Sequence, residues 1–384
     1  MWPLPRLPHS RLAWLSLGMV ALAWALGEWV AERTPLTLLL AYVPPLVWLF
    51  PALLALVWTL YGRLRGRRRG VGLALLALGL ALRGAGLLHW RPQGDGELRV
   101  LTYNVARGTL GGPEAFLKTL RDADADVILL QETNFIPAGY GDRLRRGLAG
   151  YDLRRGHEVW TLSRLPVVGE RQILLPGSRR VLLETELRRP DGTRLTVINA
   201  HLHTVLVSSA LRGRWDEVRT TARARTWEVA ELCRLATEAA GPVLLGGDLN
   251  TPPRGLLYRR LTRCIGPDAH DVVGRGPAWT FPSLYLRIDH QMARGLTPRH
   301  AEVRPTPGSD HLPLLVSYTD SAPFRHSRER AAYGSIPRNL YFVPTPFSRI
   351  SSPSVGDSIG ISITAEGSVH VTTLRPANLT SRRL

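Results

Sequence analysis

The stretch LLGGDLNTPP, residues 244–253, carries a carboxylate and an amide at the end of an apolar run. A Gly-Pro pair before the run and a Pro-Pro pair after it predict a short buried strand that ends near Asp248. Because side chains alternate across a strand, Asp248 and Asn250 are expected on the same side. Two such groups can hold one water molecule between them, or they can merely cap backbone groups of the loop. The rest of the chain has to decide between these two interpretations.

The same arrangement recurs along residues 98–319, where several predicted strands end at a polar side chain. The patterns LRVLTYN and DVILLQE are typical of buried strands, and the turn RPDG predicts a hairpin whose second strand ends in NAH. The segments LRIDHQMARG and GSDHLPLLVSYT carry further acids and a histidine. We therefore expect one shared cleft. Its candidate residues are Asn104, Glu132, His201, Asp248 with Asn250, Asp289, and Asp310 with His311.

In this order, the motifs TYNV, LQET, NAHL, GGDLNTPP, RIDH and GSDH resemble those of the endonuclease/exonuclease/phosphatase superfamily, the DNase I-like group. The segments TLSRLPV and TFPS resemble its bacterial members. The resemblance covers residues 98–319 and implies an α/β fold. In this fold, a four-layer α/β sandwich, two mixed sheets pack face to face and are flanked by helices. It also implies a divalent-metal-dependent hydrolase of phosphate esters.

The resemblance assigns the metal ion, Mg²⁺ or Mn²⁺, to Glu132, with Asn104 in a supporting place beside it. Asp310 is expected to join them. Carboxylate and amide oxygens are the hard ligands that these cations prefer. The three residues are therefore the predicted metal site.

The remaining motif residues are assigned to the water and the phosphate. Asp248 would orient and deprotonate the attacking water, and Asn250 would fix the water or the phosphate. His311 would contact a phosphate oxygen and would be held by Asp289 as its carboxylate partner. His201 would donate a hydrogen bond to the phosphate from the opposite wall.

Several neighbours of these motifs are expected to have other roles. His203 shares a face with His201 and is predicted to support the site or the loop, whereas His290 is predicted to be structural. Arginines adjacent to motifs are predicted to be solvated rather than to grip substrate; they are Arg107, Arg164 and Arg287. In abasic-site endonucleases an acid follows the first motif shortly, but NVARG offers an arginine, which argues against abasic-site repair.

Residues 1–90 are strongly apolar and are predicted to form a membrane segment with three transmembrane helices. Its apolar runs cover residues 12–27, 34–62 and 71–90. The arginine-rich stretch RLRGRRRG between the last two runs predicts a cytoplasmic loop. A cleaved signal peptide is the alternative for the first run. The third run is short and contains Arg83; if it spans, the following domain lies outside the cytoplasm, and otherwise it lies inside.

The other parts of the chain carry weaker signals. Residues 91–97 are a polar linker, and residues 320–384 are predicted to be a disordered tail in which GISITAEGSVHVTTL could form a hairpin. Cys233 and Cys264 lack CxxC spacing, so a zinc site is not expected, and their pairing stays open.

These observations predict a membrane-anchored, metal-dependent phosphoesterase at the cell membrane, with a multi-pass anchor and an extracytoplasmic catalytic domain. Its partners would be the lipid bilayer and a phosphorylated substrate, with no protein partner predicted. Three substrates compete: a lipid-linked phosphate or pyrophosphate of the cell envelope, nucleic acid, and a phospholipid headgroup. A membrane-tethered nuclease is the alternative enzyme. The formal net charge of +18 is spread along the chain and does not mark one binding surface. A non-catalytic module that binds a phosphate ligand is the alternative from another class.

Overall fold

A computed structural model describes residues 9–65, 70–175, 180–205, 207–321, 358–363 and 369–374. The chain divides into two units, residues 1–324 and residues 325–384. In the second unit, β12 (Ser358–Ile363) pairs antiparallel with β13 (Val369–Leu374), as the hairpin pattern predicts. The predicted disorder of the rest of the tail concerns residues 322–357, 364–368 and 375–384, which lie outside the described residues.

The strands of the first unit run from residue 98 to residue 320. Their bounds are β1 (Leu98–Asn104), β2 (Val127–Gln131), β3 (Asp152–Arg155), β4 (Val159–Ser163), β5 (Val167–Leu174), β6 (Val181–Arg188), β7 (Arg194–His201), β8 (Val243–Asp248), β9 (Asp289–Arg294), β10 (Leu296–Val303) and β11 (Leu314–Asp320). Within the described residues they form two mixed sheets, with the orders β10-β11-β1-β2-β4-β3 and β5-β6-β7-β8-β9. The pairs β1–β2 and β7–β8 are parallel, and the other neighbours are antiparallel.

The described helices lie before and between these strands. Their bounds are α1 (His9–Ala25), α2 (Pro35–Ala41), α3 (Leu49–Leu64), α4 (Val71–Gly84), α5 (Pro113–Ala123), α6 (Tyr140–Gly147), α7 (Val207–Leu211), α8 (Trp215–Glu238), α9 (Gly255–Cys264) and α10 (Ala269–Val273). Short helical turns are η1 (Leu26–Val30), η2 (Ala31–Arg33), η3 (Pro45–Trp48), η4 (Ala106–Gly108) and η5 (Pro282–Leu284).

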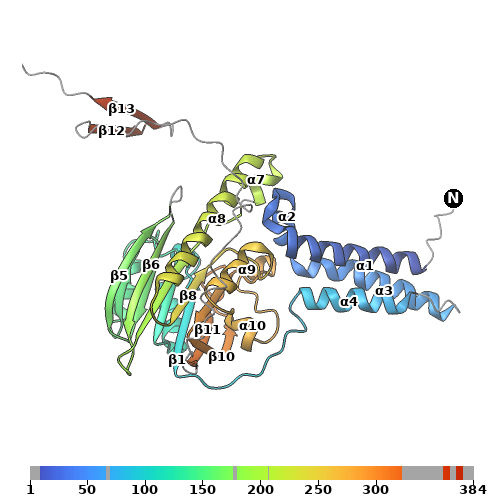
Figure 1. The fold of residues 1–384 in the computed structure, drawn as a ribbon, viewed down its shortest axis with the longest axis horizontal. Coiled ribbons are helices and arrows are strands. Elements are labelled where there is room, and N and C mark those ends of the chain that lie inside the picture. The colour runs from blue at the N-terminus through green and yellow to red at the C-terminus, as the bar shows by residue number, and fades with distance from the viewer. Residues whose placement is uncertain are drawn as a thin grey trace, which may run out of the picture. The chain divides into compact units, whose positions relative to one another are not determined.

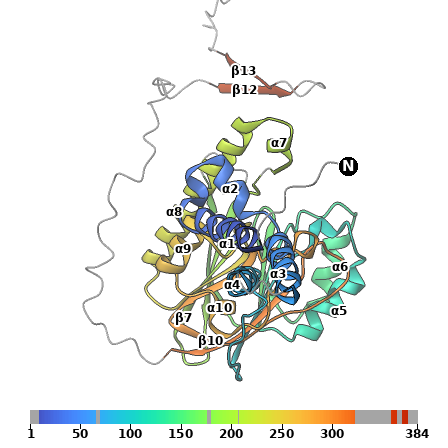
Figure 2. The same cartoon turned by 90° about the vertical axis from the view of Figure 1, so that its right-hand side faces the viewer.

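The two sheets pack face to face, and helices cover their outer faces. Figure 2 shows α5 and α6 on one side of the sheets and α8 and α9 on the opposite side. Side-chain alternation explains the layers. Along β1, Val100 belongs to the core between the sheets, whereas Leu101 and Tyr103 belong to the core with α5 and α6. Along β8, Leu244 faces the other sheet, and Leu245 packs with α8 and α9. The predicted four-layer α/β sandwich is confirmed.

Helices α1, α3 and α4 lie side by side (Figure 1) and meet through small side chains. One contact is formed by Ala13, Ala55 and Ala74, which are fully buried. Small residues let helix backbones approach closely, as in membrane-embedded helix pairs. Two helical stretches, 10–33 and 45–64, are long and apolar enough to cross a membrane, and α4 is shorter. The first stretch is also compatible with a signal sequence, because it lies near the N-terminus.

The apolar run predicted over residues 34–62 is divided in the structure. Helix α2 ends at Ala41, and a new helical stretch begins at Pro45. The reason is local, because Pro44 and Pro45 lack a backbone N–H and disfavour helical geometry in the residue before each of them. Helix α2 is therefore free to pack elsewhere, and its Leu38 is buried against Val205 and Val218 of the domain that follows.

Cys233 in α8 and Cys264 in α9 form a disulfide, which resolves the pairing that the sequence left open. The bond joins the two helices that cover the outer face of the second sheet. Disulfides persist in oxidising environments and are rare in the cytosol of most organisms.

We expect the Cys233→Ser/Cys264→Ser double variant to lose about 3 to 4 kcal/mol of unfolding free energy, because the bond closes a loop of 31 residues in the unfolded chain. Denaturant unfolding of the variant and of the reduced wild type measures the loss, and the two should agree. Equal stability of oxidised wild type and double variant would show that the bond contributes nothing.

Candidate active site

Strand ends bring the predicted site residues to one edge of the sandwich. In the second sheet, His201 at the end of β7 is in register with Asp248 at the end of β8, and Asp248 is in register with Asp289. Strand β9 runs antiparallel to β8, so the start of β9 lies beside the end of β8. Asp289 is the first residue of β9 and therefore lies beside Asp248. In the first sheet, Asn104 ends β1 and Glu132 directly follows β2.

Asn104 connects the two sheets at this edge. Its Nδ2 donates to Oδ2 of Asp248 at 3.0 Å and to Oε1 of Glu132 at 3.2 Å. Its Oδ1 accepts a hydrogen bond from the backbone N–H of Ala106 at 3.0 Å, which fixes the orientation of the amide. Asn104 and Asp248 are buried, whereas the Glu132 side chain is 29% exposed and opens toward solvent.

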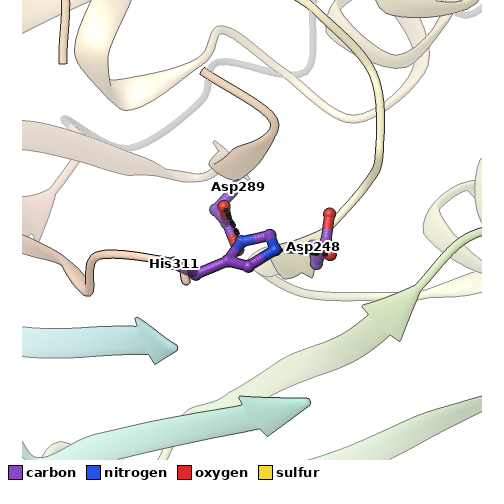
Figure 3. A group of neighbouring side chains, drawn as sticks. All are labelled: Asp248, Asp289 and His311. Atoms are coloured by element: carbon purple, nitrogen blue, oxygen red, sulfur yellow. Dashed lines mark hydrogen bonds and ion pairs between the residues drawn. The ribbon is translucent and has the colours of Figure 1, made fainter. Parts of the chain in front are cut away.

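His311 lies between two carboxylates (Figure 3). Its Nδ1 is 2.8 Å from Oδ2 of Asp289, and its Nε2 is 3.7 Å from Oδ2 of Asp248. Burial by itself lowers the pKa of His311, but the charges of Asp289 and Asp248 outweigh burial and raise this pKa to about 10. At neutral pH the ring therefore carries both protons and faces Asp248 as a hydrogen-bond donor.

His201 approaches Asp248 from another side. Its Nε2 is 3.6 Å from Oδ2 of Asp248 and 3.9 Å from Oε1 of Glu132. On the far side of the ring, Nη1 of Arg180 lies 2.8 Å from Nδ1 of His201. The same Nη1 donates to Oε2 of Glu158 at 2.5 Å. Burial raises the pKa of Glu158, but contacts with His201 and Arg180 outweigh it and lower this pKa to about 2. An ionised carboxylate and a guanidinium thus hold the ring with Nε2 facing the centre.

Glu158 and Arg180 were missed by the sequence reasoning. A signal for Glu158 was present, because it directly precedes the strand pattern VWTLS. The pattern of polar strand ends gives no signal for a strand start, but β4 runs antiparallel to β2, so the start of β4 lies at the site. Arg180 precedes β6 and carries no local pattern that would mark it.

The two oxygens of Asp248 make different contacts. Oδ1 accepts a hydrogen bond from the backbone N–H of Asn250 at 2.9 Å, so it caps the loop. Oδ2 faces Asn104, His201 and His311. The side-chain amide of Asn250 donates to the carbonyl of Leu202 at 3.0 Å and so orders the loop. Asp248 thus caps the loop with Oδ1, while its Oδ2 faces the cluster; the catalytic role of Asp248 and Asn250 stays a prediction.

Asp310 lies beside this cluster and is exposed. Ser309 Oγ is 3.4 Å from its Oδ1 and also accepts a hydrogen bond from the backbone N–H of His311. The charge of Asp310 adds to those that raise the pKa of His311.

The histidines outside the cluster have partners of their own. His203 contacts the buried Glu228 at 2.5 Å. Nδ1 of His290 lies 2.5 Å from Oδ2 of Asp268, and its Nε2 lies 2.7 Å from the backbone carbonyl oxygen of Thr251. The side chains of His290 and Asp268 are fully buried. His290 thus has the structural contacts that the sequence predicts.

The predicted solvation of the motif arginines is wrong for Arg287. Arg287 is buried. Its Nη1 lies 2.9 Å from Oδ2 of Asp268, and its Nη2 lies 2.6 Å from Oδ1 of Asp271. Arg107 is exposed, and Arg164 pairs with the exposed Asp124 at 2.7 Å. Arg287 follows the β-bridge residue Leu286 and lies in the interior of the domain. The two ion pairs stabilise its buried charge.

The residues of the site fit a divalent cation. Ligand atoms of Asp248, Asp289 and His311 lie within 4.8 Å of one another and could hold a metal. The raised pKa of His311 disfavours that residue as a ligand, because a protonated ring offers no lone pair. Oδ1 of Asp289 is buried and has no hydrogen-bond partner among the described residues. Glu132, partly exposed beside Asn104, supplies the hard oxygen that Mg²⁺ or Mn²⁺ prefers.

Comparison with known families and proteins agrees with this arrangement. The model of the Endonuclease/Exonuclease/phosphatase family matches residues 101–311. A UPF0294 protein of Vibrio vulnificus is 28% identical over 240 residues, which cover 59% of this chain and 78% of that protein. A UPF0294 protein of Vibrio parahaemolyticus is 25% identical over 238 residues, covering 59% and 79%.

The chain is also similar to solved structures. An endonuclease/exonuclease/phosphatase from Beutenbergia cavernae has a TM-score of 0.49 and 20% identity, covering 59% of this chain and 72% of that one. The catalytic domain of human Nocturnin has a TM-score of 0.45 and 17% identity, covering 60% and 96%. Such similarity says nothing about the substrate of this chain.

We expect Asp289→Asn to destabilise the protein most at pH 5 to 6.5 and progressively less toward pH 10. The folded pKa of His311 is raised from 6.5 to about 10, so its contribution is fully present below 6.5 and is lost as the pH rises through 10. Thermal unfolding of both proteins in EDTA across this range measures the difference. A constant difference from pH 6 to pH 10 would contradict the pairing.

Proposed function

The chain is a member of the Endonuclease/Exonuclease/phosphatase family, and on that premise we propose that it is a membrane-anchored, divalent-metal-dependent phosphoesterase. It hydrolyses a phosphate ester or pyrophosphate bond. The observation that carries this proposal is the convergence of two histidines on one oxygen. Each histidine has a carboxylate partner behind it, and both face Oδ2 of Asp248 at 3.6 and 3.7 Å.

The side chains supply the steps that phosphate hydrolysis needs. Asp248 accepts a proton from the attacking water, and its other oxygen is already fixed by the loop. His311 carries a proton on each nitrogen and donates to a phosphate oxygen, which stabilises the charge that develops there. His201 donates from the other side, with Glu158 and Arg180 fixing its ring.

A bound Mg²⁺ or Mn²⁺ would be held by Glu132 with Asn104 beside it, and with Asp310 from the loop before His311. It would polarise the phosphoryl oxygen and offset the negative charge of the substrate. Without such a cation, the carboxylates of the site would repel an anionic phosphate.

The proposed location is the cell membrane, with the catalytic domain outside the cytoplasm. The support comes from the apolar helices before the domain and from the arginine-rich stretch between α3 and α4. The disulfide between Cys233 and Cys264 also favours an oxidising compartment. A three-span anchor remains part of this proposal.

A membrane location favours a lipid-linked phosphate or pyrophosphate as substrate, because anchoring raises the local concentration of membrane substrates. The strongly basic chain, with a pI of about 11.1, supports a membrane-tethered nuclease as the second candidate. A phosphate-binding module without catalysis is the remaining alternative.

The test is hydrolysis by the purified full chain in detergent with Mg²⁺. The substrates are bis(p-nitrophenyl) phosphate, a polyprenyl pyrophosphate, a phospholipid and single- and double-stranded DNA. Activity on the polyprenyl pyrophosphate that EDTA abolishes is the expected result. Activity confined to DNA would establish the nuclease, and activity on none of them would favour the binding module.

We expect Asp248→Asn to lower kcat by about 10² to 10⁴-fold, the usual contribution of a positioned base. The fold should persist, because Asn caps a loop about as well as Asp. The measurements are kcat and the melting temperature of one purified variant. A well-folded variant with normal kcat would remove Asp248 from the chemistry.

Glu132→Gln should abolish activity and weaken Mg²⁺ binding, because the substitution keeps the shape of the side chain and removes its charge. Isothermal titration calorimetry with Mg²⁺ measures the affinity directly. Glu170→Gln is the control, since Glu170 is exposed on β5 and should leave the affinity unchanged. Equal affinity in Glu132→Gln and wild type would refute the metal assignment.

A further inference from the structure

Residues 28–42 lie between α1 and α3 and contact the catalytic domain. We call these residues the docking segment. Glu28 forms an ion pair with Arg259 of α9, and the backbone carbonyl of Glu28 accepts from the same guanidinium. The carboxylate of Glu32 accepts hydrogen bonds from the backbone N–H groups of Leu256 at 2.8 Å and Leu257 at 3.4 Å. Glu32 thus caps the N-terminus of α9, where a negative charge is stabilised.

The domain side of this contact has a residue that permits the close approach. Gly255, the first residue of α9, has φ of +91°, a conformation that L side chains rarely adopt. A Cβ built on Gly255 would lie 2.9 Å from Oε1 of Glu32 and 3.0 Å from Cβ of Ala31. The close approach therefore requires a glycine at position 255 in the domain, as well as Glu32 in the docking segment.

The other end of the docking segment reaches the active-site loop. Helix α2 packs against the domain through Leu38, and Tyr42 follows directly after this helix. The hydroxyl of Tyr42 donates to the backbone carbonyl of Asn250 at 2.5 Å. Asn250 has a left-handed backbone, with φ of 45°, and its N–H is bonded to Oδ1 of Asp248. A chain of two hydrogen bonds thus connects the docking segment to the proposed catalytic base.

We propose that Tyr42 is a positioning residue of this active site, so that docking of the membrane segment completes the catalytic centre. The hydroxyl holds the carbonyl of Asn250, and the turn in its left-handed conformation then directs Oδ2 of Asp248 toward His201 and His311. The proposal rests on the proposed phosphoesterase function. It adds that a catalytic domain without its anchor has a less ordered base, so that activity depends on the attached helices.

The test compares Tyr42→Phe with Tyr61→Phe in the full chain. Tyr42→Phe removes only the hydroxyl, and a small displacement of a catalytic group can cost roughly 10- to 100-fold in rate. We expect kcat to fall by about this factor while KM changes less than about threefold, because the substrate contacts stay. Tyr61 lies on α3 and is half-exposed, so Tyr61→Phe should match the wild type.

A second measurement does not depend on activity. Hydrogen–deuterium exchange should become faster at residues 249–251 in Tyr42→Phe and stay at the wild-type rate in Tyr61→Phe. Wild-type kcat and wild-type exchange in Tyr42→Phe would overturn the proposal. An inactive wild type would instead refute the phosphoesterase function, and the exchange comparison would still test the positioning role.

Glu32→Gln provides an independent route in case Tyr42→Phe does not fold. Loss of the charge weakens the cap on α9 and should loosen the docking segment while Tyr42 keeps its hydroxyl. The expected result is a lower kcat and faster exchange at residues 249–251. A Glu32→Gln protein with wild-type values of both would show that docking has no influence on the site.

Discussion

The hydrogen bond from Asn104 to Asp248 joins the two sheets at the edge where their polar strand ends meet. Asn104 belongs to β1 and Asp248 to β8, so neither sheet alone contains the site. The sheets keep this alignment through the apolar core between them and through buried polar contacts such as Gln131 with Asn199 at 2.8 Å. A shift of one sheet against the other would separate the polar strand ends of the two sheets. The proposed catalytic arrangement thus depends on the packing of the two sheets.

The site also concentrates negative charge in a buried place. Glu158, Asp248 and Asp289 are all buried, and a buried carboxylate is costly unless it is paired. Arg180 offsets the first, and the protonated His311 lies between the other two. Oδ1 of Asp289, which has no hydrogen-bond partner in the described part of the chain, and the left-handed backbone of Asn250 add to this cost. Such local costs are common at functional sites, where the surrounding fold enforces a geometry that function needs.

The sequence predicts those site residues that follow a strand, because apolar runs and the alternation of apolar and polar side chains locate strand ends. Asn104, His201 and Asp248 are predicted in this way, and the structure brings them together. Glu158 stands before the start of an antiparallel strand, where a pattern of strand ends gives no signal. The burial of Arg287 and the packing of α2 against the domain depend on partners distant in the sequence. The same holds for Tyr42, which lies 208 residues from Asn250. Contacts of this kind follow from tertiary packing and leave no local pattern.

The most direct test of this account is a double-mutant cycle on kcat/KM with Asn104→Ala, Asp248→Asn and the double variant. If the two side chains act as one unit across the sheets, the double variant should lose far less than the product of the single losses. A coupling of about 1 to 3 kcal/mol is the predicted result for residues in contact. Additive losses, within about 0.5 kcal/mol, would contradict the claim that the hydrogen bond between the sheets organises the site.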